Sequence, residues 1–217
     1  MKYRVEPAGQ YRLARDLIRS TAATSARAGA MAIDHFDPMI AQRALVCGLG
    51  TTLPTGGKWD EKYWEVVTVN GKQKKYPGSI KGIQWCGIYA TWVWRQSGID
   101  NVVFEIGKGV RFVGSAGILQ SNDLSYLAPG DIIVDCTPPP PPPPPAPPKP
   151  PVYHHMLVLN TNVSNPVTAM YVHQGNSVRG PETESEVSNA EVSSLKGKIY
   201  LYYSLDTIQD PKIAYRR

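Results

Sequence analysis

The chain has 217 residues, of which 42% are apolar, and this suits one ordinary domain with a hydrophobic core or two small domains. A net charge of +5 is mildly basic and fits an anionic partner, such as a cell-wall polymer, a nucleic acid or a membrane surface, without selecting among them. The three cysteines are an odd and low count, which argues against a disulfide framework and leaves at least one thiol free.

The presence or absence of known motifs limits the classes of partner and the cellular compartment that we expect. Arginine and lysine residues are spread along the chain without a recognised nucleic-acid motif, so we expect solvated charges and no nucleic-acid partner. No apolar run approaches the length of a membrane span. The N-terminus lacks the apolar segment of a secretory signal peptide, so we expect synthesis in the cytoplasm. Any action outside the cell then requires export or injection by a secretion or phage-like system.

The first 80 residues are predicted to hold helices and a hairpin. Residues 10–32 have a helical pattern rich in small residues. A second helix is expected to start at the Asp-Pro pair 37–38 and to stop at Gly48 or Gly50. Within "EVVTVNGKQKKYP", the Asn-Gly pair at 70–71 predicts the tight turn of a short β-hairpin.

The segment "GIQWCGIYATWVWRQSGI" predicts a buried helix from Cys86 to Ser97, with Gly98 as its C-terminal cap. Cys86 lies at the expected N-terminus, where free N–H groups and the helix dipole favour a thiolate. A cysteine protease or amidase needs this arrangement, because the thiolate is the nucleophile and the N–H groups hold the oxyanion. The alternative is a packing cysteine, which is common in aromatic-rich helices.

Four β-strands are expected after this helix, in the segments "LAPGDIIV", "HHMLVLN", "AMYVHQ" and "KIYLYYSL". Helices followed by a run of strands with short turns indicate an α+β domain with an antiparallel sheet. We therefore expect one domain over residues 1–217, with an N-terminal helical and hairpin portion, 1–80, and a catalytic core, 81–217.

The run Pro138–Pro151 contains only two residues that are not proline, Ala146 and Lys149. Such a segment adopts polyproline II and cannot join a sheet. If the flanking segments form one site, the run is a loop between neighbouring strands and not a linker between domains. Two roles remain open: an inert, protease-resistant loop, or an arm that docks a proline-binding partner or a delivery apparatus.

His155 opens the strand "HMLVLN" and is expected to act as the general base for Cys86. In order, the Cys86 helix, "LAPGDIIV", "HHMLVLN" and "VHQGNS" resemble papain-like peptidoglycan amidases and endopeptidases of the CHAP and NlpC type. The resemblance covers about residues 80 to 205. It implies a papain-like fold with Cys86 as nucleophile, His155 as base, and Gln174 or Asn176 as the group that orients the imidazole.

The sequence also departs from that family pattern. Gln174 stands where a carboxylate is often found, and an amide stabilises the imidazolium less. His173 is a rival third member, but it should point to the opposite strand face from Gln174. Gln84 is considered as an oxyanion donor, and Trp85 as part of a substrate groove together with Trp92 and Trp94, although core packing is expected for at least two of these tryptophans.

These observations predict a cysteine hydrolase that cleaves amide bonds in the peptide stems of bacterial peptidoglycan, as a delivered antibacterial toxin or lysin. One alternative keeps the chemistry but targets a host protein, as a cysteine protease, deamidase or transglutaminase. Another alternative is a non-catalytic interaction protein that binds through its proline-rich loop. No cofactor is expected, and no Cys/His spacing suggests a metal site.

Overall fold

The computed structural model describes residues 38–80, 83–113, 120–121, 123–138, 153–162, 164, 166–176 and 186–205. The helix expected at 10–32 lies outside these residues, as does all of the proline-rich run beyond Pro138. Within the described ranges the chain has mixed α and β content, which confirms the α+β class.

The larger sheet is antiparallel and has six strands in the order β5-β10-β6-β7-β8-β9. The strands at its centre and edges are β5 (Gln120–Ser121), β6 (Ile132–Asp135), β7 (His154–Thr161), β8 (Met170–Gln174), β9 (Ser188–Val192) and β10 (Tyr200–Tyr203). The four strands expected from the sequence are therefore present, in β6, β7, β8 and β10. A short 3-10 helix, η2 (Leu124–Tyr126), precedes β6.

A second, four-stranded sheet has the order β2-β1-β3-β4. The expected hairpin is formed by β1 (Val67–Val69) and β2 (Lys72–Gln73), with Asn70 and Gly71 both at positive φ in the turn. The remaining strands are β3 (Val102–Glu105), which runs parallel to β1, and β4 (Gly109–Phe112), which pairs antiparallel with β3. This sheet is mixed, so the prediction of antiparallel pairing holds only for the larger one.

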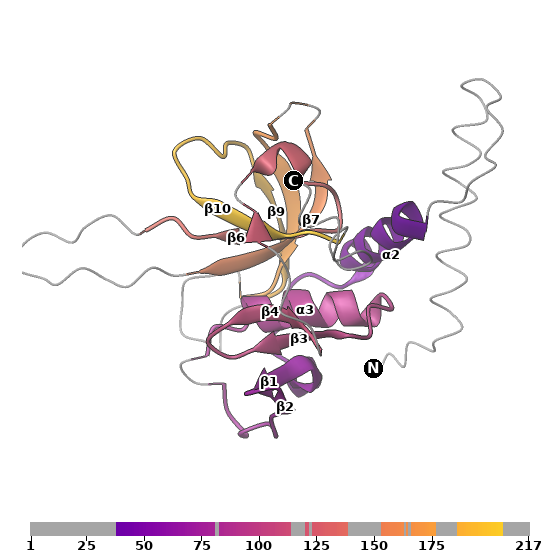
Figure 1. Cartoon of the computed structure of the whole chain (residues 1–217), viewed down its shortest axis with the longest axis vertical. Coiled ribbons are helices and arrows are strands. Elements are labelled where there is room, and N and C mark those ends of the chain that lie inside the picture. Colours follow the sequence, from indigo (N-terminus) through magenta and orange to yellow (C-terminus); the bar gives the residue numbers. More distant parts are fainter. Residues whose placement is uncertain are drawn as a thin grey trace, which may run out of the picture.

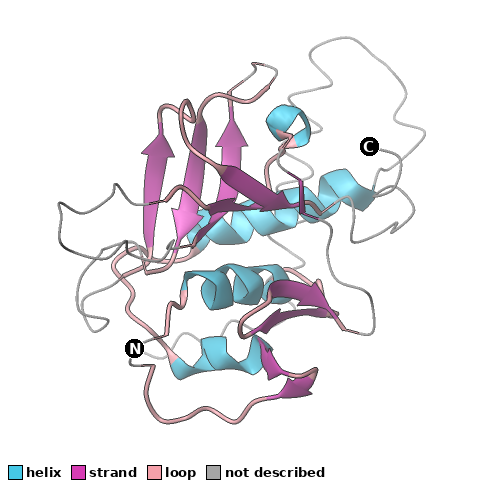
Figure 2. Ribbon diagram, turned by 60° about the vertical axis from the view of Figure 1, so that its left-hand side comes forward, coloured by secondary structure: helices cyan, strands magenta, loops and turns pink. Residues whose placement is uncertain are grey.

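Helix α3 (Cys86–Gln96) lies between the two sheets, with β7 on one side and β3 and the 3-10 helix η1 (Glu61–Val66) on the other (Figure 1). Its residues from Cys86 to Trp94 are all buried, and Gly98 follows its end at a φ of 93°. Helix α2 (Pro38–Thr52) also packs on α3 and β7. Figure 2 shows the helices crossing the middle of the molecule between the sheets.

Helix α2 corrects one boundary, because it continues to Thr52, past both glycines at which it was expected to stop. Gly50 is buried, and a Cβ there would come within 2.8 Å of Leu159 and 2.9 Å of Leu157 on β7. Glycine at this position therefore allows close packing of the helix on the sheet and does not mark the end of the helix.

The two strands that flank the proline-rich run pair with each other. In the β6–β7 register Asp135 lies opposite His154, and Val134 lies opposite His155. The run therefore connects neighbouring strands of one sheet, and residues before it and after it share a single hydrophobic core. This pairing brings the start of β7 to the N-terminus of α3.

Candidate active site

Cys86 and His155 meet between α3 and the larger sheet. The Sγ atom of Cys86 lies 3.8 Å from Nδ1 of His155, although 69 residues separate them in the chain. The backbone N–H of His155 also points at the sulfur, at 3.4 Å, and the carbonyl oxygen of Tyr153 lies 3.7 Å from it. The two residues singled out as nucleophile and base are thus in contact.

Local sequence explains this close approach. Cys86 is the first residue of α3, and its N-cap, Trp85, provides no side-chain hydrogen bond to the free N–H groups of the first turn. Gly87 follows, and a Cβ at this position would overlap the ring of Phe104 and come within 3.1 Å of Nδ1 of His155. Only glycine leaves room for the imidazole beside the start of the helix.

Aromatic rings hold the imidazole of His155. Tyr203 on β10 stacks on it with ring centroids 6.3 Å apart and planes at 12°, and Phe104 on β3 meets it edge-on at 5.7 Å. Among the described residues, no side chain is found within hydrogen-bond distance of Nε2 of His155. In the described part of the chain, its orientation is therefore set by aromatic packing and by the contact with Cys86.

Burial dominates the electrostatics of this pair, since Cys86 is 1% exposed and His155 is 8% exposed. Burial raises the pKa of the Cys86 thiol above its ordinary value, and the nearby N–H groups of His155, Gly87 and Cys86 oppose the rise only in part. Burial, assisted by His154, lowers the pKa of His155 to about 3. At neutral pH the resting pair is therefore an uncharged thiol beside an uncharged imidazole.

Gln174 does not contact His155, which corrects its expected role as the orienting group. Its Oε1 lies 2.8 Å from Nε2 of His154, and its Nε2 donates to Ser188 at 3.3 Å. Successive strand residues point to opposite faces, so His154 and Gln174 share one face of the sheet, whereas His155 lies on the other face, toward α3. His154 therefore points away from Cys86 and bonds to Gln174.

His173 lies on the α3 side of β8, opposite Leu157 in the strand register, and its side chain is buried. Its Nε2 lies 2.8 Å from the Tyr89 hydroxyl, and its Nδ1 lies 2.7 Å from Oδ1 of Asn189. His173 therefore faces away from Gln174, as expected, but it links α3 to the sheet instead of bonding to His155. Asn176, at a φ of 59°, lies in the bend after β8.

The residues before Cys86 have separate environments. Gln84 is exposed, and Trp85 is fully buried. Trp85 stacks with Tyr63 and meets Trp59 edge-on, and it belongs to the same core cluster as Trp92 and Trp94. All three tryptophans of this segment are thus core residues, so the interpretation of Trp85 as a groove-lining residue is wrong. The signal that favoured the core was the apolar character of α3 on every side.

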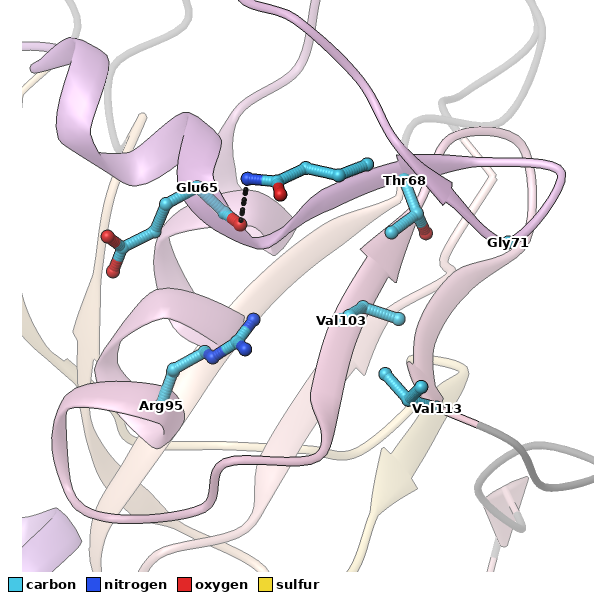
Figure 3. A pocket seen from close by; sticks show the side chains of 7 residues that line it. Glu65, Thr68, Gly71, Arg95, Val103 and Val113 are labelled. Atoms are coloured by element: carbon cyan, nitrogen blue, oxygen red, sulfur yellow. Dashed lines mark hydrogen bonds between the residues drawn. The ribbon is translucent and has the colours of Figure 1, made fainter.

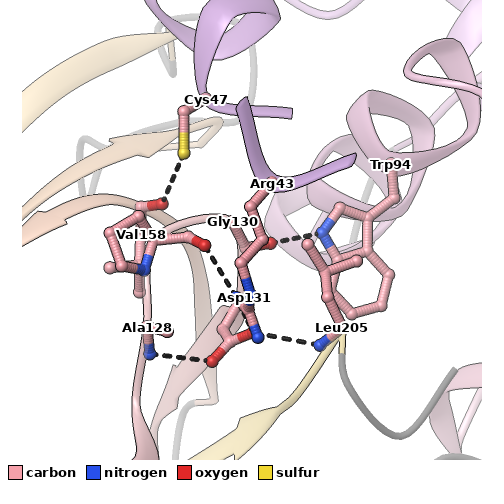
Figure 4. A network of polar contacts seen from close by, with 9 residues as sticks. Arg43, Cys47, Trp94, Ala128, Gly130, Asp131, Val158 and Leu205 are labelled. Carbon is pink, nitrogen blue, oxygen red and sulfur yellow. Dashed lines mark hydrogen bonds and ion pairs between the residues drawn. The ribbon is translucent and has the colours of Figure 1, made fainter. Parts of the chain in front are cut away.

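A second polar cluster, around Asp131, was not singled out from the sequence (Figure 4). One carboxylate oxygen of Asp131 accepts from Arg43 at 2.8 Å and from the Leu205 N–H at 3.0 Å, and the other accepts from the Ala128 N–H at 2.9 Å. Arg43 also donates to the carbonyl oxygen of Pro129 at 2.7 Å. The acid of the "PGD" turn thereby ties α2, the start of β6 and the end of β10 together.

Burial raises the pKa of Asp131 to about 6, against the opposing effect of Arg43 and the backbone donors. The carboxylate is therefore charged at neutral pH and has a donor on each oxygen. Beside it, Cys47 is half-buried, and its Sγ lies 3.8 Å from the carbonyl oxygen of Val158. Burial raises the pKa of the Cys47 thiol to about 11, which fits a packing residue.

Three further findings bear on function. Over the described ranges, no group of three His, Cys, Asp or Glu side chains is placed to hold a metal ion. Neither described helix combines the length and the apolar character that crossing a bilayer requires. Comparison of the chain with family models, with curated proteins and with solved structures finds no match.

Proposed function

We propose that the chain is a cysteine hydrolase with a papain-like fold that cleaves amide bonds, with Cys86 as nucleophile and His155 as base. The observation that carries this proposal is the 3.8 Å contact between Sγ of Cys86 and Nδ1 of His155 at the first residue of a buried helix. A thiol at a helix N-terminus beside an imidazole is the arrangement that nucleophilic cysteine catalysis requires. The antiparallel sheet packed against that helix supports the papain-like assignment.

In the proposed reaction, Nδ1 of His155 accepts the thiol proton while Sγ attacks the substrate carbonyl carbon. The neutral resting imidazole suits this step, because an unprotonated Nδ1 is needed as acceptor. First-turn N–H groups of α3 stabilise the oxyanion. The imidazolium then protonates the leaving amine as the C–N bond breaks, which leaves a thioester on Cys86. His155 next deprotonates a water molecule that hydrolyses the thioester and restores the thiol.

Access to the sulfur requires a movement of the chain. Cys86 is 1% exposed, and the carbonyl oxygen of Tyr153, just before β7, lies beside Sγ. The Tyr153 side chain is itself 53% exposed, so it is not anchored in the core. In this proposal the segment that carries Tyr153 moves outward when substrate binds, and the thiol exchanges its contact with the Tyr153 carbonyl for the substrate.

The proposed substrate is the peptide stem of bacterial peptidoglycan. Two observations support it: the ordered motifs that resemble peptidoglycan amidases and endopeptidases, and the net charge of +5, which favours association with an anionic wall polymer. The competing substrate class is a host protein. Both classes share the same chemistry at Cys86.

Digestion of purified cell walls by the wild type, by Cys86→Ala and by Cys136→Ala tests the proposal. We expect soluble stem peptides from the wild type and from Cys136→Ala, because Cys136 is a thiol outside the site, and none from Cys86→Ala. Parallel incubation with eukaryotic cell lysate distinguishes a host-protein substrate. Equal digestion by the wild type and by Cys86→Ala would remove Cys86 from its proposed role.

The burial of the pair favours a second candidate function, a non-catalytic interaction protein in which Cys86 only packs. In that case, the raised pKa of the Cys86 thiol and the lack of a polar partner on Nε2 of His155 among the described residues have no catalytic consequence. Slow alkylation of Cys86 at high pH only, together with no hydrolysis of walls or lysate proteins, supports this candidate. Hydrolysis that is lost in Cys86→Ala excludes it.

A further inference from the structure

A pocket of about 450 Å³ lies beside the smaller sheet, away from Cys86 (Figure 3). It is lined by residues of η1, the β1–β2 hairpin, the last turn of α3 and the β3–β4 pair: Glu65, Thr68, Gln73, Arg95, Val103 and Val113, with Gly71 at the hairpin turn. Its volume falls within the range of roughly 300–1,000 Å³ that is typical of small-molecule sites. We call it the Arg95 pocket.

The Arg95 pocket and the candidate active site occupy opposite ends of α3. Arg95 follows Cys86 by nine residues, which corresponds to roughly 14 Å along a helix axis. On β3, Val103 lines the pocket, whereas its neighbour Phe104 packs against His155. The pocket is thus a separate feature that a ligand can occupy without touching Cys86.

A cation with no partner among the described residues faces this pocket. Arg95 is half-buried, and among the described residues its guanidinium has no hydrogen bond and no ion pair. The acid that lines the same pocket, Glu65, accepts a hydrogen bond from Gln96 at 2.7 Å instead of pairing with Arg95. In Figure 3 the Arg95 guanidinium points toward Val103 and Val113 across the pocket. A guanidinium held in this way is suited to a planar, two-oxygen anion.

Thr68 supplies a second unsatisfied group. It is 7% exposed, and its hydroxyl oxygen is buried with no hydrogen-bond partner in the described part of the chain. A buried polar atom without a partner is uncommon and costs stability unless a ligand or water satisfies it. Thr68 lines the same pocket as Val103 and Val113, so a ligand there reaches its hydroxyl when the side chain turns about χ1.

We propose that the Arg95 pocket binds a small carboxylate that carries an apolar group, such as the C-terminal residue of a peptide or a free amino acid. The carboxylate pairs with Arg95 and accepts from the Thr68 hydroxyl, and the apolar group packs on Val103 and Val113. A carboxylate is favoured because Arg95, the Thr68 hydroxyl and the two valines together match one anionic group with a hydrocarbon neighbour.

Titration of the ¹⁵N-labelled full chain with N-acetylleucine tests the proposal, and N-acetylleucinamide is the matched probe without the charge. We expect the acid to shift the amide resonances of Thr68, Arg95 and Val103, and the amide to bind at least about tenfold more weakly. Free leucine identifies the source: tighter binding of leucine indicates an amino acid, and tighter binding of N-acetylleucine indicates a chain end.

Variants of the full chain complete the test. Arg95→Gln is expected to weaken N-acetylleucine binding by about tenfold or more, and Thr68→Val by a few-fold without loss of thermal stability. Lys72→Gln removes an exposed charge from the same hairpin outside the pocket lining, so its affinity should equal that of the wild type. Equal binding of acid and amide, no binding of the acid, or unchanged affinity in both pocket variants would overturn the proposal.

Discussion

Two polar clusters sit in the core of this protein, and they differ in how completely their atoms are bonded. Asp131 has donors on both carboxylate oxygens, from Arg43 and two backbone N–H groups, all within 3.0 Å. Cys86 and His155 make one side-chain contact at 3.8 Å, and the imidazole is held by aromatic rings. In the first cluster each carboxylate oxygen of Asp131 accepts a hydrogen bond, so this cluster stabilises the fold. The second makes fewer and longer polar contacts, although it buries two ionisable groups.

The largest expected effect is a loss of the proposed hydrolysis when the cluster of Cys86 and His155 is changed. Replacing His155 with Gln removes the proposed base but keeps a polar side chain, so we expect the proposed hydrolysis to fall by about 10⁴-fold or more while the fold persists. Turnover of wall peptides, with circular dichroism as the check on folding, measures this. Activity within tenfold of the wild type would contradict the role of His155.

Asp131→Ala is expected to act on stability. It leaves the Arg43 guanidinium and two backbone N–H groups without their acceptor, which should lower the free energy of unfolding by about 3–5 kcal/mol. Urea unfolding measures the loss. Asp135→Ala is the control on the same strand, because Asp135 is only partly buried and accepts one short hydrogen bond, from the Thr137 N–H. An equal decrease in the free energy of unfolding in the two variants would show that the Asp131 cluster stabilises the fold no more than an ordinary partly buried acid does.

The clusters should also respond to pH in opposite directions. The folded pKa of His155 is lowered to about 3, so unfolded chains bind the extra proton and stability falls as pH drops from about 6.5 toward 3. The folded pKa of Asp131 is raised to about 6, so its contribution is complete below about 3.9 and is lost as pH rises through 6.

Unfolding free energies of His155→Gln and the wild type across this range isolate the histidine. We expect the difference between the two proteins to change steadily in favour of the variant as the solution is acidified. His154→Gln serves as the matched control, because His154 lies on the other face of the sheet. A pH-independent difference between wild type and His155→Gln would show that His155 is not kept neutral by burial.

The smallest effect is expected at Gln174. Its amide contacts His154 and Ser188 on the face of the sheet that points away from Cys86. Gln174→Ala should therefore change turnover by less than about twofold and stability by less than about 1 kcal/mol. A fall in turnover comparable with that of His155→Gln would return Gln174 to the orienting role that the family resemblance implies.

Elements with strong local signals were predictable from the sequence. The Asn-Gly turn, the helix that starts at Cys86 and ends before Gly98, and the strands β6, β7, β8 and β10 all appear where the sequence indicates them. The pairing of Cys86 with His155 was also expected, from the resemblance of the ordered motifs to papain-like amidases and endopeptidases.

Most features of the fold and of the site that the sequence did not predict depend on contacts between distant segments. Strands β3 and β4 are an exception, because they form a local hairpin that was not singled out from the sequence. In contrast, β9 has a polar sequence that becomes a strand by pairing with β8. Gln174 was expected to contact His155 but bonds to His154, because its contact depends on strand face and register. The contribution of Asp131 to stability depends on Arg43, which lies 88 residues away in the chain. No local sequence pattern reveals that partner.

The order of strands in the larger sheet has a consequence for a chain cut between β6 and β7. Strands β5 and β6 would belong to the first fragment and β7 to β10 to the second, yet β6 lies between β7 and β10, and β5 pairs with β10. The fragments would interlock strand by strand. Cys86 would lie on one fragment and His155 on the other, so hydrolysis by co-expressed halves would report their reassembly. The connection between these strands is thus a natural place to divide the chain into two fragments that reassemble.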